Sequence, residues 1–577
     1  MSIQYFSKRR ITETPELRRI KNLPTRTWSD ADANKLASDL TELLKTPQGK
    51  WKLRTVQAIA LYEMGTYGGL FGPIRVGGGK TLTTLLAPYV LEAKRPILLL
   101  PAALIEKTER ERRELAKHWR IPVNLRIMSY EMLGRVQAAE TLTFYKPDLI
   151  ISDESHKLKN KRAGVTRRVA RYMREHPDTK FVALSGTVMK GSIRDFAHIL
   201  RWCLKDGAPI PKTEGELEEW ADSLDEKVNP LNRINPGPLT TLAPAMGADE
   251  LQVARRAFQA RLCSTPGVVA TKAGEDVDCS LYIRALKYDV SPITDKHFHT
   301  LRSKWETPDG WALSEAVGVW RHSRELAIGL HYAWSPRPPE EWVNRRREWA
   351  AFVRETLSHS RTLDTELQVA MACDAGQLDG EALRAWRAVR DTFKPNPVPC
   401  WHDDSALLAC EAWMKQGPGI VWCEHVFFAE ELSKRTGVPY FGANGVDKTG
   451  LPIEKADPTK PLIASIAANS TGRNLQAWSR NLITACPTGA AQWEQLLGRT
   501  HRDGQQADQV EVDLLIGCAE HIDGWTRALS AAAASEDTLG HTQKLLVADK
   551  LFPSTQEMSN YSGARFQRNY NVEKLVL

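Results

Sequence analysis

GPIRVGGGKTLTTLLAP, at residues 72–88, carries the strongest structural signal in this chain, since three consecutive glycines join a short apolar run to a helical pattern. Glycines lack side chains, so the backbone N–H groups of such a loop can approach a phosphate group closely. The helix that follows directs its positive N-terminal end toward the same phosphates. We therefore predict a nucleotide site whose loop residues are Gly77, Gly78, Gly79, Lys80 and Thr81.

The polar side chains of this loop predict the ions it would bind. Lys80 would bring a positive charge to the β and γ phosphates of ATP, and the Thr81 hydroxyl would bind Mg²⁺. The general phosphate-loop pattern has a glycine at the position of Ile74, which this chain lacks. Taken alone, the segment could also be a turn followed by a helix.

Short apolar runs alternate with helical patterns in two parts of the chain. Uninterrupted apolar runs are typical of parallel strands that helices cover on both faces, and the alternation predicts an α/β fold. We expect two parallel-sheet lobes with a helical block between them. The predicted strands are PILLLP, LRIMSY, DLIISD and KFVALSG in the first lobe, SLYIRALKYDV at 280–290, and GIVWCE, VPYFGA, LIASIA, NLITAC and VEVDLLI in the second.

These patterns divide the chain into five expected parts. They are an N-terminal extension at 1–50, the first lobe at 51–205, a mainly helical connector at 206–398, the second lobe at 399–545 and a tail at 546–577. A helix is expected at DADANKLASDLTELLK in the extension. Half of the tryptophans fall between Trp305 and Trp413, and we favour packing between helices over base stacking for them.

Composition excludes some classes of protein. The chain has 577 residues and a net charge of +8, which allows a nucleic-acid partner without demanding one. We find no apolar run long enough for a transmembrane helix and no secretory signal at the N-terminus. The nine cysteines are scattered singly, which favours a reducing compartment, hence the cytoplasm, and disfavours a structural metal.

Paired acids follow the third predicted strand, in IISDESHKLKN at 150–160. In enzymes that hydrolyse ATP, one such carboxylate holds the magnesium and its neighbour polarises the attacking water. We assign the first role to Asp153, together with Thr81, and the second to Glu154. A solvated loop is the plain alternative, but it fits poorly downstream of a phosphate loop.

Two polar segments stand out in the second lobe. QLLGRTHRDGQ, at 495–505, contains Gln495, Arg499 and Arg502. Arginines three apart lie on one face of a helix, so both are expected to point into one cleft and contact a γ-phosphate. NSTGRNLQ, at 469–476, is expected to form a loop whose glycine lets the backbone approach a ligand.

With these residues in hand, the chain resembles superfamily 2 helicases of the DEAD/DEAH-box type, most closely the Swi/Snf-like branch of DNA translocases. The resemblance covers residues 50–205 and 400–530, and its overall style is similar to helicases of tailed bacteriophages. The helicase form of the phosphate loop has its glycine at position 77. The segments that carry the resemblance are LRTVQ, IRVGGGKT, LLLPAALIEKTERE, SYEML, DESHKLKN, LSGTVMKGS, VWCEHVFFAEEL, NSTGRNLQ and QLLGRTHRDGQ.

The resemblance implies further site residues. Gln57 would read the adenine of ATP, and Gln495 would belong to the nucleotide site. Contacts to nucleic acid would come from Pro101, Tyr130, Ser185, Thr187 and Thr471. The chain departs from the family at Val188, where proline is usual, and at Arg473, where leucine is common.

The implied activity is that of an ATP-dependent motor that moves along nucleic acid, with double-stranded DNA as the expected partner and ATP and Mg²⁺ bound between two RecA-like lobes. Bacterial or phage-infected host cytoplasm is the expected location. Three alternatives stay open: a translocase that remodels protein–DNA complexes without separating strands, a motor that feeds a partner nuclease, and an inactive ATP-binding scaffold.

Overall fold

The structure is a computed structural model that divides the chain into two compact units. The first unit comprises Met1–Asp276, Val353–Asp379 and Ser530–Gln543, and the second comprises Val277–Phe352, Gly380–Leu529 and Lys544–Leu577. The predicted site residues Gly77 and Thr187 lie outside the described residues, as does Val188. The described residues are 9–74, 78–138, 140–186, 192–226, 228, 232–271, 279–310, 313, 316–360, 363, 365–540, 542–551 and 564–566.

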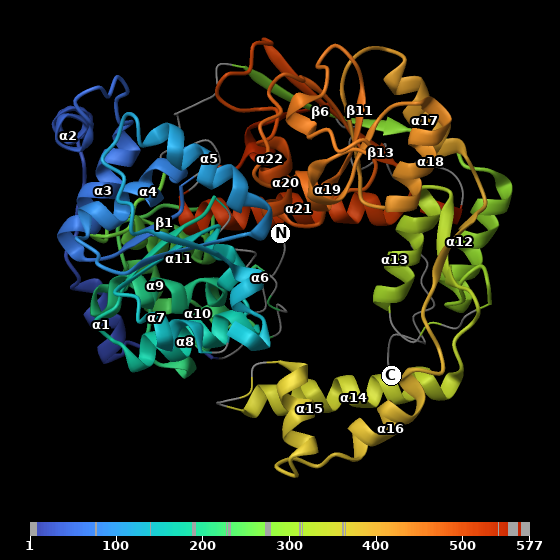
Figure 1. Cartoon of the computed structure of the whole chain (residues 1–577), viewed down its shortest axis with the longest axis horizontal. Helices are drawn as coiled ribbons and strands as arrows, with labels where there is room; N and C mark the ends of the chain where they lie inside the picture. Colours follow the sequence, from blue (N-terminus) through green and yellow to red (C-terminus); the bar gives the residue numbers. More distant parts are fainter. Residues whose placement is uncertain are drawn as a thin grey trace. The chain divides into compact units, whose positions relative to one another are not determined.

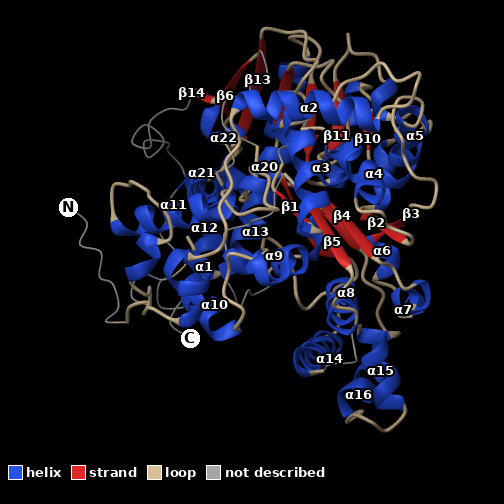
Figure 2. Ribbon diagram, turned by 90° about the vertical axis from the view of Figure 1, so that its left-hand side faces the viewer, coloured by secondary structure: helices blue, strands red, loops and turns tan. Residues whose placement is uncertain are grey.

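A five-stranded parallel sheet forms the centre of the first unit (Figure 2). Every pairing between its neighbours is parallel, as the apolar runs predicted. In order across the sheet, the strands are β1 (Leu70–Gly72), β5 (Lys180–Leu184), β4 (Leu149–Asp153), β2 (Pro96–Leu100) and β3 (Arg126–Ser129).

Both faces of this sheet are covered, which explains why its strands are apolar throughout. Leu98 and Leu100 of β2 pack into one buried cluster with α2, α3 and α4. Ile97 and Leu99, which point the opposite way, join a second cluster with α6, α8 and α9. The helices of this region are α2 (Asp30–Leu44), α3 (Thr55–Tyr67), α4 (Lys80–Val90), α5 (Ile105–Leu115), α6 (Tyr130–Leu133), α7 (Thr141–Tyr145), α8 (Gly164–Glu175) and α9 (Ala197–Leu204).

The second unit contains a seven-stranded sheet, also with parallel pairing throughout. Helices α17 and α18 pack together against one face (Figure 1). The strand order is β10 (Tyr440–Phe441), β11 (Leu462–Ser465), β9 (Ile420–Cys423), β12 (Arg480–Ile483), β13 (Gln509–Ile516), β6 (Ser280–Lys287) and β14 (Asp549–Leu551). Its helices include α17 (Ser405–Met414), α18 (Val426–Thr436), α19 (Ile466–Asn469), α20 (Ala490–Leu497) and α22 (Lys544–Val547). Helix α21 (Ala519–Leu539) belongs to this unit as far as Leu529 and to the first unit from Ser530 on.

The middle of the chain differs from the single helical connector expected at 206–398. Helices α10 (Glu214–Leu224) and α11 (Glu250–Cys263) belong to the first unit, because Phe258 and Leu262 share a core with Phe71 and Phe181 of its sheet. Strand β6 instead completes the second sheet. The second unit also contains α12 (Pro292–Lys304), α13 (Ala316–Ala327) and an antiparallel pair, β7 (Leu330–Trp334) and β8 (Pro397–Trp401).

The two ends expected outside the lobes belong to the two compact units. In α1 (Pro15–Lys21), Leu17 and Ile20 are fully buried in the core of the first sheet. At the other end, β14 pairs with β6 in the second sheet.

Tryptophans of the middle region serve as packing anchors, as favoured from the sequence. Trp342 lies on α14 (Glu340–His359) and makes edge contacts with Trp334, Trp386 of α16 (Glu381–Arg390) and Phe393. Helix α15 (Glu366–Asp374) follows α14. Among the described residues, every helix is too short or too polar to cross a lipid bilayer.

Candidate active site

The predicted residues of the first lobe meet at one edge of the first sheet. Strand register aligns Leu184, at the end of β5, with Gly72 at the end of β1 and with Asp153 at the end of β4. The loops that leave these three strands therefore begin side by side. They contain the phosphate loop, the Asp153–Glu154 pair and Ser185, at the carboxyl edge where open α/β sheets bind ligands.

The phosphate loop ends in a conformation that only glycine adopts without strain. Gly79 caps the N-terminus of α4 with φ of 76°, in the left-handed region. The Gln57 side chain lies against it: its amide donates to the Gly79 carbonyl at 3.0 Å, and its Oε1 accepts from the Arg54 backbone N–H at 2.9 Å. A Cβ at position 79 would lie 2.2 Å from Gln57 Nε2.

Gln57 is therefore a support of the loop as well as a candidate reader of adenine. Both ends of its amide are engaged by backbone groups, and its side chain is buried. The sequence pattern located this residue but not its contact with Gly79, which depends on how α3 packs beside α4.

Lys80 and Asp153 form the charged centre of this edge. The Lys80 ammonium donates to the Ile74 carbonyl at 3.1 Å, and its charge acts on Asp153. Burial, and then the charge of Glu154, raise the pKa of Asp153 well above its ordinary value, whereas Lys80 lowers it. A divalent cation would stabilise the ionised form, so Asp153 and the neighbouring Thr81 suit Mg²⁺.

Glu154 is held in an unusual backbone conformation. Its φ of 55° and ψ of 49° lie in the left-handed region, which costs energy for a residue with a side chain. Its Oε2 lies 3.3 Å from His156 Nδ1 and accepts from the Ser185 hydroxyl at 3.4 Å. His156 Nδ1 and Ser185 Oγ are 3.1 Å apart, so the three side chains form one polar cluster.

This cluster gives His156 a role that the sequence reading did not assign. Its imidazole and the Ser185 hydroxyl together orient the carboxylate of Glu154, the residue expected to polarise water. Ser185 is fully buried, so it supports the acid rather than offering a surface for nucleic acid. The sequence already contained an indication of this role, namely a histidine two residues after Glu154.

Two other expected nucleic-acid contacts occupy the interior, which corrects their assignment. Tyr130 is only 4% exposed; its hydroxyl donates to the Asp153 carbonyl at 2.6 Å and lies 2.7 Å from Ser152 Oγ. Pro101, at the end of β2, is buried as well. Tyr130 therefore supports the strand end that carries Asp153, while its aromatic ring lies in the buried core of the first unit.

In the second unit, Arg499 and Arg502 converge, but not by the predicted route. Helix α20 ends at Leu497, and both arginines follow its cap at Gly498, so they do not share a helix face. They nevertheless donate to the same carbonyl, that of Arg473, at 3.0 and 3.3 Å. A turn rather than a helix brings the two guanidinium groups together.

The loop at 469–476 supports these arginines. The Thr471 hydroxyl donates to Gln495 Oε1 at 3.2 Å, which ties the loop to α20. Arg502 also donates to Asn474 Oδ1 at 2.6 Å. Arg473 pairs with Glu454 at 3.1 Å, so the leucine-to-arginine departure is accommodated by an acidic partner. Thr471 and Gln495 thus help to fix the position of the turn that carries Arg499 and Arg502.

A cavity of about 510 Å³ adjoins the phosphate loop in the first unit. Gln57, Gly79 and Thr81 form one wall of it, and the exposed ring of Trp51 lies at its margin. Its charged lining is mixed, with the cations Lys52, Arg54 and Arg110 beside the acids Glu111 and Glu114. The position beside the loop fits the base and sugar of a nucleotide whose phosphates lie on the loop.

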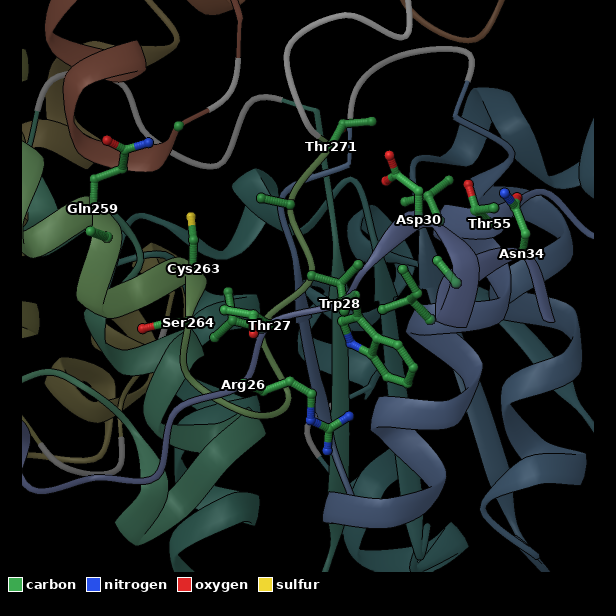
Figure 3. Close-up of a pocket in the computed structure, with 18 residues that line it drawn as sticks. Arg26, Thr27, Trp28, Asp30, Asn34, Thr55, Gln259, Cys263, Ser264 and Thr271 are labelled. Atoms are coloured by element: carbon green, nitrogen blue, oxygen red, sulfur yellow. The ribbon is translucent and has the colours of Figure 1, made fainter. Parts of the chain in front are cut away.

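A larger cavity of about 690 Å³ in the same unit has a different character (Figure 3). Among the described residues that line it, Arg26 is the one cation; it is engaged by Glu63 and Tyr67 and is turned away from Asp30 and Asn34. A triphosphate needs cations and open backbone N–H groups, so this cavity does not suit one.

Comparison with known proteins leaves the family undecided: no protein-family model matches the chain, and no curated protein matches it.

Proposed function

We propose that this chain is an ATP-driven motor that acts on nucleic acid, built on two RecA-like lobes as in superfamily 2 helicases. The main support for the proposal is one observation. A glycine-rich loop followed by Lys80, a paired Asp153–Glu154 and the His156–Ser185 cluster all lie at the carboxyl edge of one parallel sheet. That combination fits ATP hydrolysis better than simple nucleotide binding.

ATP would bind with its phosphates on the loop and its base in the neighbouring cavity. Lys80 would neutralise phosphate charge, while Thr81 and Asp153 would hold Mg²⁺, which when bound supplies further positive charge to the phosphates. Glu154 would accept a proton from the attacking water, since the cluster with His156 and Ser185 fixes its carboxylate.

The second unit would complete the site with Arg499 and Arg502. A guanidinium group stabilises the charge that builds on the transferred phosphoryl group, and two of them converge here on one carbonyl. If ATP needs both units, its binding draws them together and its hydrolysis releases them, which is how nucleotide turnover would drive stepping.

The nucleic-acid half of the proposal rests on the family resemblance and favours duplex DNA. Grip would come mainly from contacts to phosphates, so binding should show low sequence preference and strong salt dependence. Of the contacts expected from the sequence, Thr471 is the one that remains partly exposed in the described residues.

ATP turnover measured against a panel of single-stranded DNA, duplex DNA and RNA tests the proposal. We expect turnover to rise when duplex DNA is added and to depend on Mg²⁺. Lys80→Ala should abolish it in protein that stays folded and monodisperse. Turnover that ignores every nucleic acid would refute the motor, and turnover retained by Lys80→Ala would refute the site.

The segment HRDGQ at 501–505 resembles the Swi/Snf-like branch, and this resemblance favours one variant of the function, translocation along duplex DNA without strand separation. Strand-displacement and triplex-displacement assays run side by side would distinguish strand separation from translocation, because a pure translocase is active only in the triplex-displacement assay. A motor that feeds a nuclease would behave in the same way alone and would also co-purify with a nuclease partner.

A further inference from the structure

Three residues near the C-terminus, Ala564–Phe566, pack against α12 of the second unit. We call the surface that they cover, formed by Asp295, Phe298 and Arg302, the groove. The carboxylate of Asp295, on α12, accepts both of the first two backbone N–H groups, from Ala564 at 3.0 Å and from Arg565 at 3.1 Å. Two amides on one carboxylate hold the backbone of this segment in a defined position.

Arg302, about two turns further along α12, binds the other side of the same backbone. Its guanidinium donates to the carbonyls of Ala564 and Arg565, the latter at 2.6 Å. The same group pairs with Glu520 at 2.6 Å, and both members of this ion pair are almost fully buried. A buried guanidinium needs several acceptors, and the segment supplies two of them.

The side chains of the segment are also recognised. The Ala564 methyl packs on a buried cluster that includes Phe298 and Trp305. Arg565 is only 4% exposed; its guanidinium lies 6.0 Å from the centre of the Tyr288 ring, which lies outside the segment, and pairs with Asp289 at 3.1 Å. Asp289 is itself mostly exposed, so burial and cation–π contact should matter more than this ion pair.

We propose that this groove is a binding site for a short peptide in which arginine precedes an aromatic residue, and that Ala564–Phe566 of the same chain occupies it as a detachable latch. Backbone contacts to Asp295 and Arg302 give affinity, and the buried Arg565 gives specificity, the division seen in peptide-recognition sites. Because the segment is part of the chain, its high effective concentration keeps the groove filled.

The proposal does not depend on ATP chemistry, since every residue in it lies in the second unit and away from the proposed nucleotide contacts. A labelled peptide with the sequence of residues 561–569 provides the probe, and fluorescence anisotropy with full-length protein provides the readout. Arg565→Ala in the protein should release the latch and open the groove to the added peptide.

We expect the peptide to bind the Arg565→Ala protein at least about tenfold more tightly than the unmodified protein, whose own segment competes. A peptide that carries Arg565→Ala should not bind, and the protein with both Arg565→Ala and Asp295→Asn should have lost the site. Arg568→Ala in the protein is the matched control and should behave as unmodified protein. Equal binding to the unmodified and Arg565→Ala proteins, or none to either, would overturn the proposal.

Hydrogen exchange provides a second measurement that needs no folded Arg565→Ala variant. In the unmodified protein, the amides of Ala564 and Arg565 should exchange at least about tenfold more slowly than in the free peptide, because Asp295 accepts both. Asp295→Asn should remove much of this protection. Exchange as fast as in the free peptide would show that the segment does not occupy the groove.

Discussion

The two candidate half-sites differ in both charge and construction. In the first unit, Asp153 ends strand β4, Glu154 follows it, and the charge of Lys80 acts on Asp153 from the start of α4. In the second unit, Arg499 and Arg502 stand on a turn and are held by one carbonyl. The first half-site is rich in acid and fixed by sheet register, whereas the second is basic and fixed by a few hydrogen bonds.

This difference indicates what each half contributes. Sheet register is insensitive to single side-chain changes, so the first unit suits the precise placement of a metal and a water. A turn can shift by small amounts, so the second unit suits a group that engages and releases a phosphate in each cycle. The predictions that follow test this division of roles.

The largest effect should come from the second unit. Arg502→Ala should lower ATP turnover by about 10³-fold or more, the range found when an arginine that stabilises phosphoryl transfer is lost. Steady-state turnover with saturating duplex DNA measures it. Arg435→Ala, which breaks surface pairs with Asp404 and Glu411, is the matched control and should leave turnover near that of unmodified protein.

Glu154→Gln should follow, with turnover reduced by about 10²- to 10⁴-fold, because the amide cannot accept the proton of the attacking water. ATP affinity, measured by equilibrium binding, should stay close to normal. Glu175→Gln, at an exposed acid on α8, is the control. Normal turnover in the Glu154→Gln protein would show that another group accepts the proton of the attacking water.

A smaller effect is expected at the phosphate loop from Gly79→Ala. The added Cβ meets Gln57 Nε2 at 2.2 Å, so the loop must shift and the KM for ATP should rise about tenfold. Gly68→Ala is a matched control, since its φ of 75° is nearly the same as the 76° of Gly79 but its Cβ would meet open space. Equal KM changes in the two variants would exclude the Gln57 contact as the cause.

The smallest effect concerns acid stability of the first unit. Burial lowers the pKa of His198 to about 4, so the folded state keeps this imidazole neutral. The unfolded state binds the proton first, and stability should therefore fall as pH drops from about 6.5 toward 4, by at most about 1.4 kcal/mol per pH unit from this group. His198→Gln should flatten the pH dependence of the free energy of unfolding, measured by urea denaturation. An unchanged pH dependence would show that other groups cause the loss of stability.

The sequence predicted the strands well because burial on both faces leaves a strong signal. All ten predicted apolar runs are strands, and their parallel pairing follows from the lack of polar alternation. Lys80 was predicted in a loop that follows a strand, and the Asp153–Glu154 pair at the end of another; register places those strand ends, at Gly72 and Asp153, along one edge. A local sequence pattern was sufficient to predict these positions, because residues at the ends of paired parallel strands necessarily lie along the same edge of the sheet.

Other features depended on contacts that no local pattern reveals. Tyr130 matched a surface motif, yet its ring is drawn into the core by packing between strands. Gly498 ends α20 one residue before Arg499, so the expected helix face never forms. The middle region was assigned to one block because its sequence shows helical periodicity. Periodicity predicts that α11 buries one face, but it does not reveal which of the two sheets that face packs against.

The central claim is that Lys80 and Arg502, on different units, act on one triphosphate. A double-mutant cycle with Lys80→Ala and Arg502→Ala, measured as affinity for a non-hydrolysable ATP analogue with Mg²⁺, tests it directly. We predict that the two effects are coupled by at least about 0.5 kcal/mol, as for residues that share a partner. Effects that add within about 0.5 kcal/mol, or no effect of Arg502→Ala, would contradict the account.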